Sequence, residues 1–109
     1  MYWVYTLLCE DGSLYTGFTD NIKHRIHVHY HQLKSAAKYT KSHKVCKIAA
    51  LWKTDSETGA RKLEYRIKHI PKAKKLLLFE KPESLSGFFP ELSDFEFFPE
   101  TEVEFEDCI

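Results

Sequence analysis

The chain has 109 residues, of which 43% are hydrophobic, and its 16 basic and 16 acidic residues give a net charge of zero. This length and composition predict one compact soluble domain with a modest core. The apolar runs are too short to span a membrane, and the N-terminus lacks a signal-peptide pattern. The three scattered cysteines have neither zinc-site spacing nor a disulfide framework, which favours a reduced cytoplasmic protein.

Charge is segregated along the chain. Residues 1–79 carry 15 basic and 6 acidic residues, a net charge of +9, whereas residues 80–109 carry one lysine and 10 acidic residues, a net charge of −9. This division predicts a basic body, residues 1–79, and an acidic, Phe-rich C-terminal tail, residues 80–109. A basic body favours binding to a polyanion, although solvated surface charge with a solubilising tail would give the same composition.

The first elements of the chain predict a β-hairpin. Residues Tyr2 to Leu8 are rich in aromatic and β-branched side chains, as strands are. Asp11-Gly12 is a hairpin turn sequence, and Leu14 to Thr19 forms the returning strand. The hairpin places Tyr5 and Tyr15 on adjacent strands.

A helix is predicted next, capped by Thr19 or Asp20 and continuing to about residue 35. Its buried stripe consists of Ile22, Ile26 and Leu33. With about 100° of rotation per residue, His29 falls inside this stripe and Arg25 at its edge. An unpaired charge there is costly, so both side chains need partners or a solvated cleft. For His29 alone, a hydrogen-bonded core histidine is the simpler interpretation.

Residues 36–44 predict a polar, basic connection to a third strand, Val45 to Lys53, which is expected at the centre of the sheet because it is largely apolar. A second helix begins near Ser56 and ends before Pro71, which suits the first turn of a further short helix that continues to Leu78. Two strands, a helix, a strand and a helix predict an α/β fold with a small sheet covered by helices.

Glu64 lies between two apolar residues on the inward face of the second helix, about 40° from Ala60. A carboxylate there is either ion-paired, with Lys68 as the ordinary partner four residues on, or a ligand. Magnesium prefers oxygen ligands and often takes only one or two carboxylates, the rest being water and phosphate. Glu64 therefore suffices for a single Mg²⁺ or Mn²⁺, but not for a two-metal site.

The tail contains six of the eight phenylalanines. Its acidity favours disorder, whereas its aromatic density argues against simple disorder. The alternatives are self-docking on the body and binding of a protein partner.

The ordered set of tyrosines, glycine, arginine, histidine and glutamate resembles the GIY-YIG nuclease superfamily, especially its small stand-alone members. The resemblance covers residues 2–78. It lies in Trp3-Val4-Tyr5, in Tyr15-Thr16-Gly17, in residues 19–25 with His29, and in the stretches 37–40 and 64–68. The first signature lacks its glycine and isoleucine, and no asparagine follows Glu64.

The resemblance implies a three-stranded antiparallel sheet flanked by helices, and it implies roles for individual residues. Tyr5 or Tyr15 would position and deprotonate the attacking water, and Arg25 would stabilise charge on the phosphate. His29 would assist proton transfer or orient the tyrosine, and Glu64 would hold the single divalent metal.

Three functional hypotheses follow. The first is a metal-dependent endonuclease acting on DNA in preference to RNA, directed by structure or damage rather than by sequence. The second is a binding module without catalysis, in which Gly17 lies near the nucleic acid, lysines contact phosphates and Tyr39 stacks on unpaired bases; these lysines are Lys38, Lys41 and Lys44. The third is that the acidic tail occupies the basic face and suppresses binding.

Overall fold

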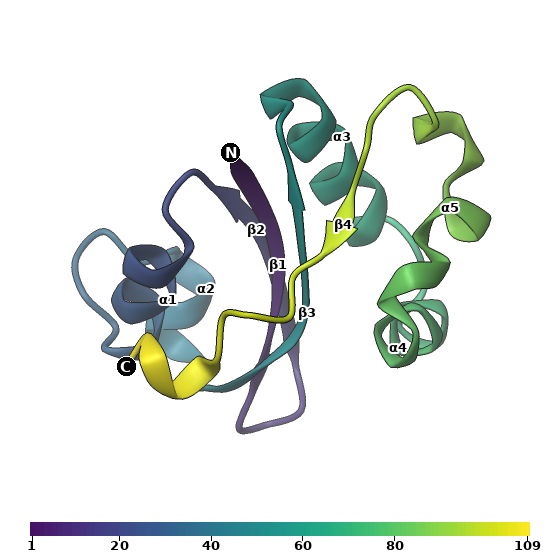
Figure 1. The fold of residues 1–109 in the computed structure, drawn as a ribbon. Helices are drawn as coiled ribbons and strands as arrows, with labels where there is room; N and C mark the ends of the chain where they lie inside the picture. The colour runs from purple at the N-terminus through teal and green to yellow at the C-terminus, as the bar shows by residue number, and fades with distance from the viewer.

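An antiparallel sheet forms the middle layer of the computed structural model, which describes residues 1–109 (Figure 1). Its four strands lie in the order β2-β1-β3-β4, and their bounds are Tyr2–Cys9 for β1, Leu14–Thr19 for β2, Val45–Thr54 for β3 and Phe98–Pro99 for β4. The expected count of three strands is therefore wrong, because two tail residues pair with Trp52 and Lys53 of β3. The α/β class and the antiparallel pairing are confirmed.

Helices cover both faces of this sheet. Figure 1 shows α1 and α2 on one side and α3, α4 and α5 on the other. Their bounds are Ile22–Tyr30, Lys38–Ser42, Glu57–Lys68, Lys72–Glu80 and Leu85–Phe88, and single 3₁₀ turns lie at Pro82–Ser84, Pro90–Leu92 and Phe105–Asp107. None of these helices combines the length and the apolar character needed to cross a bilayer.

The core consists of two clusters, one on each face of the sheet. Successive strand residues point to opposite faces, so Val4 and Trp52 pack towards α3, whereas Tyr5 and Leu51 pack towards α1. This two-sided burial explains why the middle of β3 is apolar without alternation. β3 is an inner strand of the sheet, as expected, and so is β1. The pairing of β3 with β1 is long, whereas its pairing with β4 involves only two residues of β3.

Helix α1 is shorter than the sequence predicts, because it ends at Tyr30 rather than near residue 35. Gln32 adopts a left-handed conformation with φ 53°. The Leu33 N–H donates to the Val28 carbonyl and the Gln32 N–H to the His29 carbonyl, the two bonds of a Schellman ending. Leu33 is consequently 43% exposed, and its expected burial is wrong.

The acidic tail is packed against the body. Leu85, Phe89 and Leu92 join the core cluster beneath α3, and the Trp52 indole donates a 2.9 Å hydrogen bond to the Pro82 carbonyl. The last residues cross to the other face, where Cys108 is buried beside α1 (Figure 1). The tail thus packs on the body of the same chain and contributes to the core on both faces of the sheet.

Candidate functional site

Tyr5 and Gly17 face each other across β1 and β2 and form the floor of the candidate site. A Cβ atom at Gly17 would lie 2.6 Å from the Tyr5 hydroxyl oxygen and 2.8 Å from its Cζ. The register of β1 and β2 is continuous here, so Gly17 does not lie at a bulge. Its missing side chain allows the Tyr5 ring to lie flat across β2 and reach α1.

A chain of hydrogen bonds links the sheet to both helices on this face. The Tyr5 hydroxyl lies 2.9 Å from His29 Nε2, and His29 Nδ1 lies 2.7 Å from Thr40 Oγ1. Thr40 donates its own proton to the Ala37 carbonyl at 3.1 Å, so it accepts from His29. His29 therefore carries its proton on Nδ1, and its Nε2 accepts the proton of Tyr5.

Both rings of this chain are buried, with Tyr5 1% exposed and His29 fully buried. Burial, with a smaller contribution from the nearby Arg25 charge, lowers the pKa of His29 to about 4. Burial also raises the pKa of Tyr5, with a smaller contribution from Tyr15. At neutral pH the pair is therefore an uncharged phenol bonded to an uncharged imidazole. The interpretation of His29 as a hydrogen-bonded core histidine agrees with this geometry.

Tyr15 lies beside the Tyr5 and His29 rings and is more exposed to solvent than either. Its ring centroid is 5.2 Å from that of His29 and 5.9 Å from that of Tyr39, and Tyr39 is stacked at 4.0 Å on His43. Burial raises the pKa of Tyr15, and the positive charge of Arg25 opposes that shift. His43, stacked on Tyr39 at an interplanar angle of 7°, covers one face of the Tyr39 ring.

Arg25 on α1 and Glu64 on α3 lie near the tyrosines from two different helices. The Arg25 guanidinium donates from Nη1 to the Ser35 carbonyl at 2.7 Å, and its charge acts on both tyrosines. The Glu64 side chain is 22% exposed and lies 3.6 Å from the Lys68 ammonium, so the expected i, i+4 pair is present. The negative charge of Glu64 raises the pKa of both tyrosines. Five sequence-selected residues are thus brought together.

The donor set near Glu64 suits a metal ion that takes most of its ligands from elsewhere. No group of three or more His, Cys, Asp or Glu side chains could hold a metal ion by itself. Glu64 supplies one partly exposed carboxylate, and a magnesium ion that binds through one carboxylate completes its shell with water and phosphate oxygens. The residues present fit such a single site.

The lysines expected to contact phosphates lie on and after α2. Lys38, Lys41 and Lys44 are exposed, and none of them takes part in an ion pair. The ion pairs of the tail lie elsewhere, from Glu100 to Lys53 at 3.4 Å and from Glu91 to Arg66 at 2.7 Å.

Two residues of the site are not identified by the sequence pattern. Thr40 fixes the His29 tautomer, and the Ser35 carbonyl holds Arg25. Thr40 lies in the predicted polar connection, residues 36–44, and Ser35 at the end of the predicted helix, and threonine and serine are ordinary in both places. Only the resemblance of residues 37–40 to the stand-alone branch points to Thr40, and it assigns no role.

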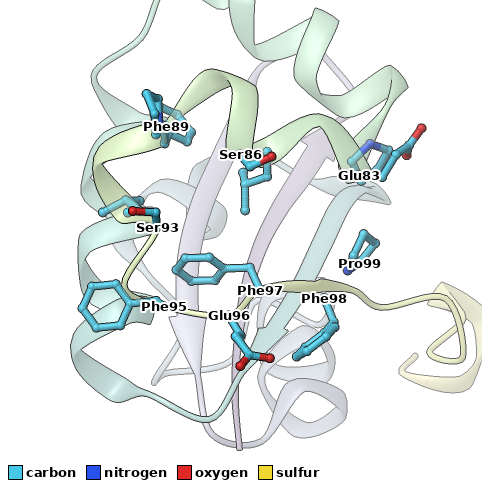
Figure 2. Close-up of a pocket in the computed structure, with 13 residues that line it drawn as sticks. Glu83, Ser86, Phe89, Ser93, Phe95, Glu96, Phe97, Phe98 and Pro99 are labelled. Carbon is cyan, nitrogen blue, oxygen red and sulfur yellow. The ribbon is translucent and has the colours of Figure 1, made fainter.

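A cavity of about 430 Å³ lies away from these residues, between α5 and the extended segment that leads into β4. Figure 2 shows Phe97 reaching from that segment towards the Ser86 turn, while Glu96 and Phe98 point to the opposite side. None of the site residues named above lines this cavity. It is a gap within the docked tail and is not the candidate active site.

Comparison with known proteins finds similarity over most of the chain. The family model described as the GIY-YIG catalytic domain matches residues 1–76. The UPF0213 protein FN1575 of Fusobacterium nucleatum subsp. nucleatum is 45% identical over 76% of this chain and 81% of its own length. The UPF0213 protein OB0043 of Oceanobacillus iheyensis is 39% identical over 75% of this chain and 93% of its own.

One solved structure is also similar. The solution NMR structure of the UPF0213 protein BH0048 from Bacillus halodurans is 35% identical in sequence. The similarity covers 85% of this chain and 94% of that chain, with a TM-score of 0.44.

Proposed function

Because this chain belongs to the GIY-YIG family, whose members are generally endonucleases, we propose that it is a divalent-metal-dependent endonuclease. Its proposed substrate is DNA in preference to RNA, recognised by structure or damage rather than by sequence. All three cysteines are free, which supports a reducing, cytoplasmic setting.

The observation that carries this proposal is the hydrogen-bond chain from Tyr5 through His29 to Thr40. An unprotonated Nε2 can accept the Tyr5 proton while the Tyr5 oxygen takes a proton from the attacking water, which Tyr15 next to it would help to position. Thr40 holds the imidazole in the tautomer that leaves Nε2 free. Hydrolysis of a phosphodiester requires this kind of proton acceptor near the attacking water.

Two groups would place positive charge beside the phosphate: the Arg25 guanidinium and a metal ion held by Glu64. Arg25, held by the Ser35 carbonyl, would donate to the non-bridging oxygens as negative charge develops. Glu64 would hold a single Mg²⁺ or Mn²⁺, and this ion would supply positive charge beside the leaving oxygen. The Lys68 ammonium next to Glu64 would contact the same phosphate or an adjacent one.

The direct test incubates the protein with labelled single-stranded, duplex, flap and branched DNAs, and with RNA, in Mg²⁺ or Mn²⁺. Cleavage of at least one DNA is expected, and Glu64→Ala should abolish it. Glu57→Ala is the matched control, because Glu57 forms the same i, i+4 pair with Arg61 on the same helix at 3.2 Å. Equal loss in both variants, or cleavage that survives Glu64→Ala, would contradict the assignment of Glu64.

A second candidate function is nucleic-acid binding without catalysis. The exposed, unpaired lysines Lys38, Lys41 and Lys44 favour it, because phosphate contacts do not need the buried hydrogen-bond chain. This candidate predicts a salt-sensitive complex that survives both chelation and Glu64→Ala, with no cleavage of any probe in the panel.

A further inference from the structure

The outer face of α3 carries a second concentration of positive charge that none of the assignments above uses. Three cations and one tyrosine line a surface hollow of about 360 Å³ together with Glu91 and Leu92 of the tail; they are Arg61, Lys62, Tyr65 and Arg66. Glu91 is the only acidic residue that lines it. Such an excess of positive charge around a hollow favours an anionic ligand.

Aromatic rings beneath the helix hold these cations in place. The Arg61 guanidinium carbon lies 5.1 Å from the Phe18 ring centroid, and the Lys62 ammonium 5.4 Å from that of Phe95. Arg66 lies 5.8 Å from the Phe89 ring centroid. These contacts hold the guanidinium groups of Arg61 and Arg66 beside the rings while both side chains stay exposed to solvent, which reduces the ordering cost of binding a phosphate.

Tyr65 adds an exposed aromatic ring to this charged hollow. It is 58% exposed, and its ring is stacked on His69 with a centroid distance of 4.0 Å and an interplanar angle of 27°. A tyrosine held by one stacked neighbour and open to solvent is a platform on which a nucleic-acid base can stack. Inside a duplex each base face is covered by its stacked neighbours, so such a platform favours unpaired nucleotides.

The hollow lies next to the candidate active site on the same helix. Glu64 directly precedes Tyr65, and the Lys68 ammonium, one turn on from Glu64, lies 5.9 Å from the Tyr15 ring centroid. Neighbouring residues of a helix point about 100° apart, so the Tyr65 side chain lies next to that of Glu64 around the surface of α3.

We propose that the α3 hollow binds an unpaired nucleotide of the DNA substrate, with Tyr65 stacking on its base and Arg61 and Arg66 contacting its phosphate. This inference rests on the proposed nuclease function and narrows its substrate to DNA with single-stranded nucleotides beside the cut. Glu91, 2.7 Å from Arg66, occupies the position of a phosphate oxygen and competes with the substrate.

The test measures fluorescence anisotropy of two labelled DNAs, a blunt duplex and the same duplex with a single-stranded extension, with chelator present. Tyr65→Ala should weaken binding of the extended DNA about tenfold and leave the blunt duplex within about twofold, whereas Tyr65→Phe should bind both normally. Phe98→Ala, which removes another half-exposed ring outside the hollow, is the matched control and should change neither. Glu91→Gln should strengthen binding of both DNAs, most visibly at low salt.

The outcomes separate this inference from the proposed function. If the intact protein binds the probes but Tyr65→Ala and Glu91→Gln bind them as the intact protein does, the hollow serves another partner, such as a protein, and the inference is overturned. An intact protein that binds neither probe would overturn the proposed function together with the inference.

Discussion

His29 is both a core residue and the central member of the proposed proton-transfer chain. Its position in the apolar stripe of α1 predicts burial, and the structure agrees. Its two partners could not be predicted from spacing, since Tyr5 is 24 residues away and Thr40 is 11 residues away, and both contacts depend on how the sheet and α2 pack. Sequence patterns give the face of a helix but not the atom that lies opposite it.

The buried, neutral state of His29 makes the stability of the protein dependent on pH. Its pKa is about 4 in the folded protein and near 6.5 when unfolded, so the unfolded chain binds more protons between these values. Stability should therefore be full above pH 6.5 and fall as the pH decreases towards 4, by up to about 3 kcal/mol. Urea unfolding at pH 7.5 and 5.5 measures the upper part of this loss.

His29→Gln, which can still donate and accept hydrogen bonds but does not titrate, is the control for this prediction. It should flatten the change in unfolding free energy between pH 7.5 and 5.5. A window above pH 5 keeps the carboxylates Asp11 and Glu100, whose pKa values are lowered, out of the measurement. An equal slope in the two proteins would assign the pH dependence to another group.

At the scale of elements, the end of α1 sets where the chain turns back towards α2. A glycine after the helix would have predicted the Schellman ending, but the left-handed position is occupied by Gln32. The Gln32 side chain donates to the Thr40 and Lys41 carbonyls, contacts that tie the helix end to α2 and help hold this conformation. Because the chain leaves the helix at Gln32, the residues that follow bring Thr40 back beside His29.

The hairpin and α3 were easier to predict. The Asp-Gly turn and the aromatic, β-branched runs define β1 and β2, and the apolar stripe of α3 is regular from Ala60 to Ile67. The fourth strand has no such pattern, because Phe98-Pro99 pairs over two residues only. Its formation depends on the docking of the tail, which is a tertiary event.

At the scale of the whole molecule, the acidic tail completes the core rather than forming a free appendage. Phe89 is 3% exposed in the cluster beneath α3, and Cys108 is 4% exposed in the cluster beside α1. Its two ion pairs to the body join Glu100 to Lys53 and Glu91 to Arg66. Charge segregation in the sequence indicates a contact between tail and body, but not which cations it uses.

The packing of the tail predicts that residues 80–109 contribute to stability. Phe89→Ala should lower the free energy of unfolding by about 3 kcal/mol, as truncation of a buried phenylalanine does. Phe98→Ala, at a residue 50% exposed, should change it by less than about 0.5 kcal/mol. Urea denaturation measures both values. Equal small effects would show that the tail does not pack on the body in solution.

The most direct test of the central claim is the rate of single-turnover DNA cleavage by variants that lack one tyrosine hydroxyl. Tyr5→Phe and Tyr15→Phe remove the two phenols of the site, and Tyr30→Phe removes one outside it on α1. We predict that at least one of the first two loses about 100-fold or more in rate with unchanged DNA affinity, while Tyr30→Phe cleaves normally. Normal rates in all three variants would contradict a nuclease mechanism that depends on the phenol and imidazole chain.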